Sequence, residues 1–260
     1  MLGALDLLTL GYGTVCVFLA AIVRGFSGFG FSMLAIISLS LVLPPAAIVP
    51  TILMLEVAAS LHLLPQIWKE VHWRSVGWLL AGCIVATPLG TYLLATVPAA
   101  PMKLALAVCV LAAATLLLRG FSLTETPGPA ATFGTGMASG VLNGSFGIGG
   151  PPVILFYFST PAAVSVSRAS VIAYFLGTDV AGLGFLGLEG LVTWESAVRF
   201  ALFLPALLLG VAIGHRSFKG ADPDAFRRWV LRLLMLLAVL SAARAVYDWL
   251  DGGGLIGPLL

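Results

Sequence analysis

Two motifs in this chain combine glycines, hydroxyl side chains and a cation in a pattern that could bind an anion. The first reads Arg24-Gly25-Phe26-Ser27-Gly28-Phe29-Gly30, and the second reads Asn143-Gly144-Ser145-Phe146-Gly147-Ile148-Gly149-Gly150-Pro151. The glycines at 25, 28 and 30 correspond to those at 144, 147 and 149 at one offset of 119 positions. Each motif interrupts an apolar stretch, and a half-helix that begins after such a break presents unpaired N–H groups and the positive end of its dipole. Two such helix starts, meeting from opposite sides, would hold an anion.

The same small residues also allow a purely structural interpretation. Glycines spaced along a helix let two membrane helices approach closely, and isolated glycines such as Gly82 and Gly210 are interpreted in that way. Pro151 fits the start of a helix after the second motif, because proline is favoured in the first turn, where no N–H is needed. For the two motifs themselves, a binding site is the favoured interpretation.

Arg24 is the first candidate for contact with a substrate. A cation in the middle of a membrane is energetically costly and normally pairs with another group, and the planar guanidinium suits an oxyanion. Asn143 is its positional equivalent in the second motif, while Ser27 and Ser145 add hydroxyl donors. The alternative is that Arg24 ends a full-length helix and extends to the lipid headgroups.

Glu56 and Asp179 are candidates for ion coupling. They occupy roughly matched positions in the first uninterrupted apolar run after each motif, and carboxylates inside membranes commonly relay protons. The alternative is a structural role, in which they pair with Arg24 or with backbone groups at helix ends.

Other kinds of chemistry find little support. The three cysteines and three histidines show no metal-ligand spacing, and there is no zinc-protease helix motif, nucleophile elbow or phosphate-binding loop. We therefore predict no metal, no cofactor and no enzymatic activity. A net charge of +2 without a clustered basic face gives no reason to expect nucleic acid as a partner.

The composition requires a membrane. The chain has 260 residues, of which 60% are hydrophobic and 9% charged, whereas soluble domains have about 25% charged residues. Six runs are apolar and about 20 residues long, as a spanning helix requires; they are 46–64, 76–97, 102–118, 170–188, 197–214 and 229–249. Two further segments, 5–43 and 130–159, are broken by the motifs. The second motif divides segment 130–159 into pieces of about 12 and 9 residues, and each piece is too short to cross the membrane alone.

The basic residues favour an inverted arrangement of two halves, 1–120 and 128–250, within one all-α polytopic membrane domain. With three spans and one re-entrant hairpin in each half, eight basic residues share one side, which the positive-inside rule makes cytoplasmic. They are Lys69, Arg74, Arg119, Arg168, Arg216, Lys219, Arg227 and Arg228. Both termini would then be extracytoplasmic. Two full crossings in place of each hairpin would give the same result, so the broken segments are either re-entrant or discontinuous.

The two motifs together resemble those of the sulfite exporter TauE/SafE family of membrane permeases. The residues that carry the resemblance are 24–31 and 143–152, and the size and two-half layout agree over nearly the whole chain. The resemblance implies a multi-pass protein of the bacterial inner membrane that transports small anions, often sulfur-containing ones such as sulfite or organosulfonates. It leaves the particular anion and the direction of transport open.

The resulting hypothesis is a secondary transporter that works by alternating access around an anion site at mid-membrane. An anion channel built on the same helix starts is the alternative. The expected partners are a small anion and the lipid bilayer; a homodimer is compatible with the sequence, which does not decide the oligomeric state.

Overall fold

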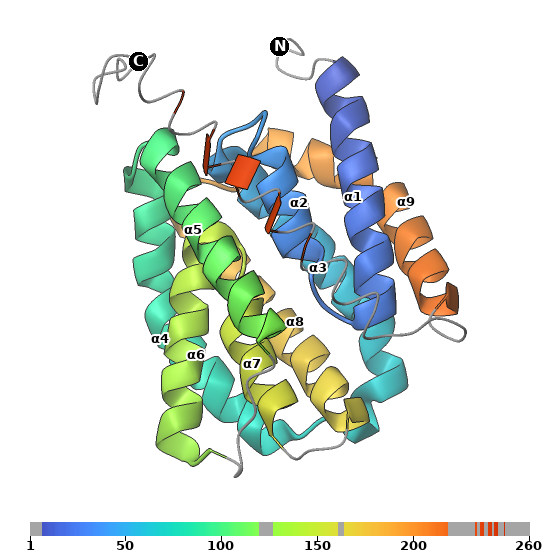
Figure 1. The fold of residues 1–260 in the computed structure, drawn as a ribbon, viewed down its shortest axis with the longest axis vertical. Coiled ribbons are helices and arrows are strands. Elements are labelled where there is room, and N and C mark those ends of the chain that lie inside the picture. The colour runs from blue at the N-terminus through green and yellow to red at the C-terminus, as the bar shows by residue number, and fades with distance from the viewer. Residues whose placement is uncertain are drawn as a thin grey trace.

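The computed structural model describes residues 7–119, 127–160 and 164–217, with single positions between 232 and 247, and these residues form helices and no strand. Figure 1 shows their arrangement. The helices are α1 (Leu7–Ser27), α2 (Phe31–Leu39), α3 (Pro45–Ile67), η1 (Trp68–Glu70), α4 (Trp73–Thr96), α5 (Ala99–Leu118), α6 (Pro129–Phe146), α7 (Gly150–Ser159), α8 (Val164–Leu188) and α9 (Trp194–Ser217). The span predicted at 229–249 lies largely outside the described residues, as do Lys219, Arg227 and Arg228.

Five of the described helices are long and apolar enough to cross a membrane. They are α1, α3, α4, α8 and α9. In α5, the described residues include a shorter apolar stretch at Pro101–Ala112. Large apolar side chains remain exposed on these helices, among them Val85, Leu188 and Leu209, as lipid-facing surfaces require. The prediction of an all-α, multi-pass membrane protein is confirmed at this level.

The first motif lies between a long helix and a short one. α1 ends at Ser27, and α2 begins at Phe31 after Gly28 and Gly30, which have φ angles of 81° and 91° that favour glycine. The hydroxyl of Tyr12, early in α1, donates to the carbonyl oxygen of Ser38, late in α2, over 3.0 Å. The two helices are therefore antiparallel, and α2 returns toward the end of the bundle at which α1 begins (Figure 1).

The second motif lies between α6 and α7 in a similar hairpin. α6 has 18 residues, longer than the piece of about 12 that we expected, because it continues as helix through Asn143 to Phe146. Gly147 then has a φ of 64°, and α7 begins at Gly150. Thr132 early in α6 and Tyr157 late in α7 line the same cavity, so α7 returns to the end at which α6 begins.

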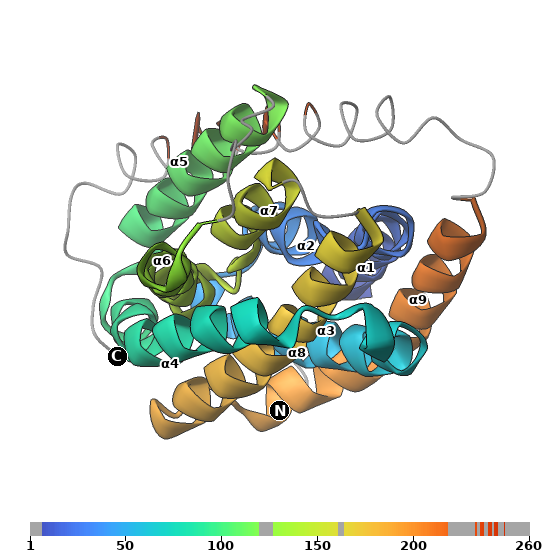
Figure 2. The same cartoon turned by 90° about the horizontal axis from the view of Figure 1, so that it is seen from below.

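Small residues hold the hairpins against distant helices. Gly136 and Gly140 on α6 lie directly against the backbone of Leu79 and Cys83 on α4, so the two helices run in the same direction in close contact. In the same way, Gly214 on α9 lies against the backbone of Ile22 on α1. Such contacts replace the hydrophobic effect as the reason for helix association in lipid. Figure 2 shows the short α2 near the middle of the bundle, with α7 between it and α5.

We predict that Gly140→Ala destabilises the protein, whereas Gly134→Ala on the same helix does not. A methyl group on Gly140 would meet the carbonyl group of Cys83, but one on Gly134 would meet nothing within 4 Å. Forcing the helices apart should cost about 1–3 kcal/mol. Thermal unfolding in detergent measures both variants, and equal midpoints for the two would show that α4 and α6 do not pack through Gly140.

Candidate functional site

Arg24 lies near the end of α1, completely buried, and is held by two helices. Its Nη1 atom lies 2.8 Å from Glu56 Oε2 on α3, and its Nη2 donates to Ser60 Oγ over 2.8 Å. The guanidinium carbon also lies 5.3 Å from the ring centre of Phe175 on α8. Nε has no hydrogen-bond partner among the described residues. Arg24 therefore points into the protein, in contrast to the alternative in which it reaches the headgroups.

Glu56 connects this arginine to the start of α2. Its Oε1 accepts hydrogen bonds from the backbone N–H of Ser32, over 3.3 Å, and from Ser32 Oγ, over 3.1 Å. Ser32 is the second residue of α2, so the carboxylate lies at the positive end of that helix. Glu56 thus combines the structural interpretations considered for it: it pairs with Arg24 and it contacts a helix end.

The second break gathers Asn143, Ser145 and Asp179. Asn143 Nδ2 donates to the carbonyl oxygen of Thr178 over 3.1 Å, and Asn143 and Thr178 both lie within hydrogen-bonding reach of the Asp179 carboxylate. All three gathered side chains are almost fully buried. Ser145 Oγ and Asp179 Oδ2 have no hydrogen-bond partner among the described residues. Buried polar atoms without partners are uncommon in proteins, so these two call for a partner such as a water molecule, an ion or a ligand.

The start of α7 offers fewer donors than the start of α2. Pro151 and Pro152 occupy its first turn, as expected, and neither has an N–H group. Ahead of them, the carbonyl oxygen of Gly149 accepts a hydrogen bond from Ser139 Oγ, which in turn accepts one from the Tyr174 hydroxyl over 2.7 Å. Ahead of Val153, Gly150 is therefore the one residue of the first turn of α7 that has an N–H group.

The remaining glycines of the motifs have different surroundings. Gly25 and Gly144 lie inside α1 and α6, and Gly144 packs against the backbone of Thr87 on α4. A side chain at Gly150 would meet the ring of Phe175. The side chain of Ser27 lies outside the described residues.

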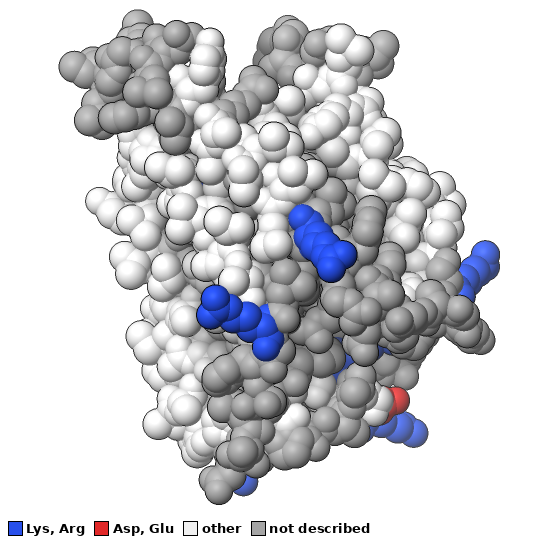
Figure 3. Space-filling view, in the orientation of Figure 1, with Lys and Arg blue, Asp and Glu red and all other residues white. Residues whose placement is uncertain are grey.

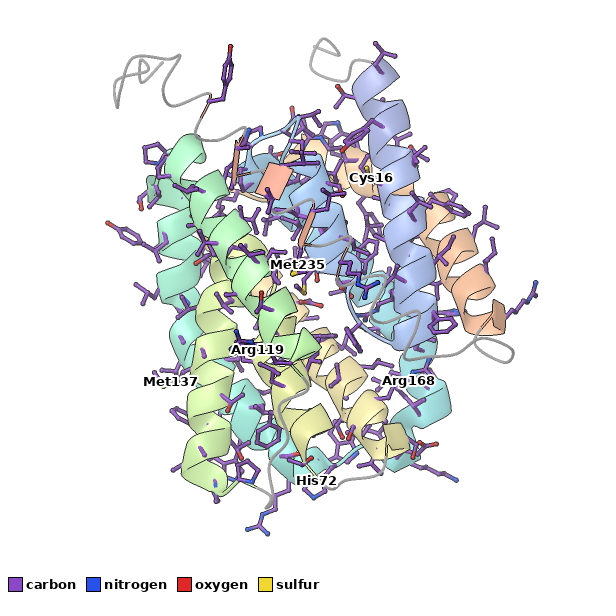
Figure 4. All side chains as sticks on the ribbon, in the orientation of Figure 1. Cys16, His72, Arg119, Met137, Arg168 and Met235 are labelled. Carbon is purple, nitrogen blue, oxygen red and sulfur yellow. The ribbon has the colours of Figure 1, made fainter. Side chains whose placement is uncertain are left out.

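Each break packs against helices from the other part of the chain. A Cβ atom at Gly28 would lie 3.0 Å from Arg168 Nε on α8, and one at Gly147 would lie 2.8 Å from Ile36 on α2 and 3.2 Å from Val49 on α3. Figure 4 labels Arg168 in the lower half of the bundle. The charges of Arg24, Glu56 and Asp179 also act on one another, since Asp179 interacts electrostatically with both of the others. The two motifs therefore contribute to one region.

Sequence reasoning missed several residues of this region. Ser60, which binds Arg24, lies 119 positions before Asp179, so the offset between the motifs could have identified it. Phe175 corresponds in the same way to Glu56. Ser32 carried no signal of its own, and Arg168 was interpreted only as a topological charge.

Two cavities lie toward the end of the bundle that we predict to be cytoplasmic. Neither cavity is lined by a residue of the two glycine motifs. One of about 320 Å³ lies among the starts of α4 and α6 and the end of α7, where Tyr157 Oη and Ser75 Oγ are 2.7 Å apart. The other, of about 730 Å³, is lined by Leu61 and Trp68. The described residues contain no group of three metal-ligating side chains.

Comparison with known proteins assigns the chain to a family. The model of the family described as sulfite exporter TauE/SafE matches residues 14–241, which covers both breaks and every helix from α2 to α9. The chain belongs to the sulfite exporter TauE/SafE family. Members of this family are membrane transporters, so the chain is a transporter and not an enzyme.

Two relatives support the assignment to the TauE/SafE family. The chain is 25% identical over 232 residues to the probable sulfite/organosulfonate exporter TauE of Cupriavidus necator, covering 86% of this chain and 90% of the relative. It is also 25% identical over 199 residues to the probable inner membrane transporter protein TsaS of Comamonas testosteroni, covering 75% and 82%. No solved structure matches the chain significantly.

We predict that Arg24→Gln and Glu56→Gln each destabilise the protein by about 3–5 kcal/mol, because each leaves one buried charge without its partner. The free energy of unfolding of the double variant should fall by clearly less than the sum of the two single losses, since the double variant buries no charge at this position. A double-mutant cycle of unfolding in detergent measures the difference. Additive losses would mean that the two charges do not stabilise each other.

Proposed function

We propose that this chain is a secondary transporter for a small anion, with sulfur-containing oxyanions or organosulfonates such as sulfite as the substrate class. The observation that carries the proposal is the buried Arg24 at the junction of α1 and α2, close to the start of a helix, because both attract oxyanions. The substrate class is supported by the name of the TauE relative and by the family description. Substrate would be held by Arg24, Asn143, Ser145 and backbone N–H groups at the two breaks.

The inverted repeat is supported by the helix bounds. Adding 119 to the bounds of α2 gives 150–158, against 150–159 for α7, and adding 119 to those of α3 gives 164–186, against 164–188 for α8. The α1–α2 hairpin opens toward the upper end of the bundle in Figure 1, whereas the α6–α7 hairpin opens toward the lower end. We take 1–120 and 128–250 as the two halves and each hairpin as a re-entrant pair.

In alternating access, each moving body would contain helices from both halves of the sequence. Because α6 packs tightly on α4 and α1 on α9, each hairpin is attached to a helix of the opposite half. Rocking one sequence half against the other would separate both contacts. We therefore propose that α4 and α6 move as one body and α1 and α9 as another, with the anion bound at the breaks between them. Glu56 and Asp179 would couple this movement to an ion.

Thermal stabilisation of the purified protein tests the anion site. Sulfite, thiosulfate, sulfoacetate, sulfate, acetate and chloride are titrated, since a ligand stabilises by RT ln(1 + [L]/Kd) and even weak binding shows at high concentration. We expect a sulfur oxyanion or sulfonate to stabilise wild type and to lose its effect in the Arg24→Gln/Glu56→Gln variant. Stabilisation of both proteins by the same anion would place the binding site elsewhere.

Transport by the reconstituted protein distinguishes a carrier from the channel alternative. A carrier loaded with unlabelled anion accelerates entry of labelled anion, because its site must return before it can bind again. We expect such counterflow in proteoliposomes. Rapid, non-saturating flux that unlabelled anion inside does not accelerate would favour the channel.

The proposed orientation places the lower end of the bundle in the cytoplasm and the termini outside. On the face in Figure 3, basic residues lie in the middle and lower parts, and the described surface of the upper third shows none. Arg119, Arg168 and His72 are labelled in the lower half of Figure 4, and Cys16 in the upper half. This asymmetry is what the positive-inside rule requires of an inner-membrane protein.

Cysteine labelling in whole cells tests the orientation. In a chain with Cys16, Cys83 and Cys109 replaced by alanine, we expect an impermeant maleimide to label Glu189→Cys in intact cells. Lys69→Cys should react only after the membrane is permeabilised. Both native side chains are exposed in the structure, so poor access would not explain a difference. The opposite labelling pattern would invert the proposed topology.

A further inference from the structure

We propose that the Glu56 carboxylate occupies the place of the transported anion in this conformation, and that a substrate anion and a proton displace it together. The inference rests on the proposed function and names how its anion site is regulated. Glu56 would act as an internal competitor that keeps Arg24 and the start of α2 neutralised until a substrate arrives.

The contacts of Glu56 are those that an oxyanion would make. One carboxylate oxygen lies 2.8 Å from the Arg24 guanidinium, and the other accepts from the N–H and the hydroxyl of Ser32. A guanidinium and the N-terminal N–H groups of a helix are the two donor sets on which the anion site was proposed. Both are already used by a carboxylate that is 2% exposed, so a substrate cannot bind to them while Glu56 stays in place.

The balance of charge requires a proton when Glu56 is displaced. The pair Arg24 and Glu56 is neutral, and a monoanion added to it would leave one uncompensated negative charge in a buried region. Protonation of Glu56 removes that charge. Arg24⁺ paired with Glu56⁻, together with X⁻ and H⁺, gives Arg24⁺ paired with X⁻ and a neutral Glu56 carboxyl group. One proton is thus bound for each monoanion, and the net charge of the site does not change.

Other charged groups around Glu56 do not take over this role. From α8, the Asp179 carboxyl group interacts electrostatically with both Glu56 and Arg24, and when ionised it makes a further anion still less favourable without a proton. Arg168, also on α8, lies against Gly28 and interacts with Arg24 and Glu70. From α9, Arg199 donates to the carbonyl oxygen of Ala47, more than two turns before Glu56 on α3. Among the described residues, Lys103 on α5 and the exposed His62 on α3 are further ionisable groups on these helices.

The Glu56→Gln variant tests whether Glu56 competes with the substrate anion or only stabilises the structure. The glutamine carbonyl can still accept the hydrogen bonds from Ser32, but Arg24 keeps its charge without a partner. The variant should therefore bind monoanions more tightly than wild type, and a bound monoanion should restore the stability that it lacks. Methanesulfonate and ethanesulfonate are suitable probes, because they remain monoanions throughout the working pH range.

The experiment is calorimetric titration of these sulfonates across about three pH units, in buffers of different ionisation enthalpy, which reports the protons bound per anion. For wild type, we expect uptake of one proton per anion and an affinity that weakens about tenfold per unit as pH rises while Glu56 is ionised. For Glu56→Gln, we expect no proton uptake, little pH dependence and at least tenfold tighter binding at neutral pH. Asp179→Asn is the matched control, and it should keep the proton uptake of wild type.

The outcomes separate this inference from the proposed function. Binding to wild type without proton uptake overturns the inference and leaves the anion site standing, and this result needs no variant to fold. Proton uptake that persists in Glu56→Gln but disappears in Asp179→Asn also overturns it. If no anion binds to wild type or to Glu56→Gln at any pH, the anion site and the inference both fail.

Discussion

A buried guanidinium requires a negative partner, and this requirement organises the centre of the molecule. Arg24 cannot remain charged and fully enclosed unless α3 supplies Glu56 and Ser60 at the depth where α1 ends. Glu56 in turn lies at the start of α2, so the ion pair fixes where that helix begins relative to α3. Three helices are positioned by one charge, and any movement that releases Arg24 must change all three.

The glycines act on the same region through the backbone. α1 and α6 end beside Gly28 and Gly147, whose φ angles few other residues adopt without strain, and the chain turns back toward the end from which it came. Inside α6, other glycines serve a different purpose, because Gly136 and Gly140 allow close contact with α4. Glycine thus forms both the turns and the packing surfaces, and its position in the sequence determines which of the two roles it has.

The two halves of the molecule resemble each other in helix bounds but differ in chemistry. In the first, the site has a cation, a carboxylate and a helix start at which the Ser32 N–H binds that carboxylate. In the second, Asn143 stands at the position of Arg24, and two prolines reduce the donors at the start of α7. An anion bound between the breaks would therefore interact more strongly with the first half. Family membership accounts for transport, and this asymmetry is where the proposed selectivity and coupling would arise.

Composition and local pattern by themselves determined that the chain is helical, crosses a membrane several times and belongs to a family of transporters. The first two properties follow from apolar runs of sufficient length, whereas the family was indicated by the resemblance of the two glycine motifs to those of TauE/SafE proteins. The length of α6 was underestimated, since a glycine-containing sequence can continue as helix when a neighbouring helix packs on it. The pairing of Arg24 with Glu56 and Ser60 was decided only by the tertiary structure. These residues lie 32 and 36 positions apart on different helices, and their contact depends on how α1, α2 and α3 pack, which no local pattern specifies.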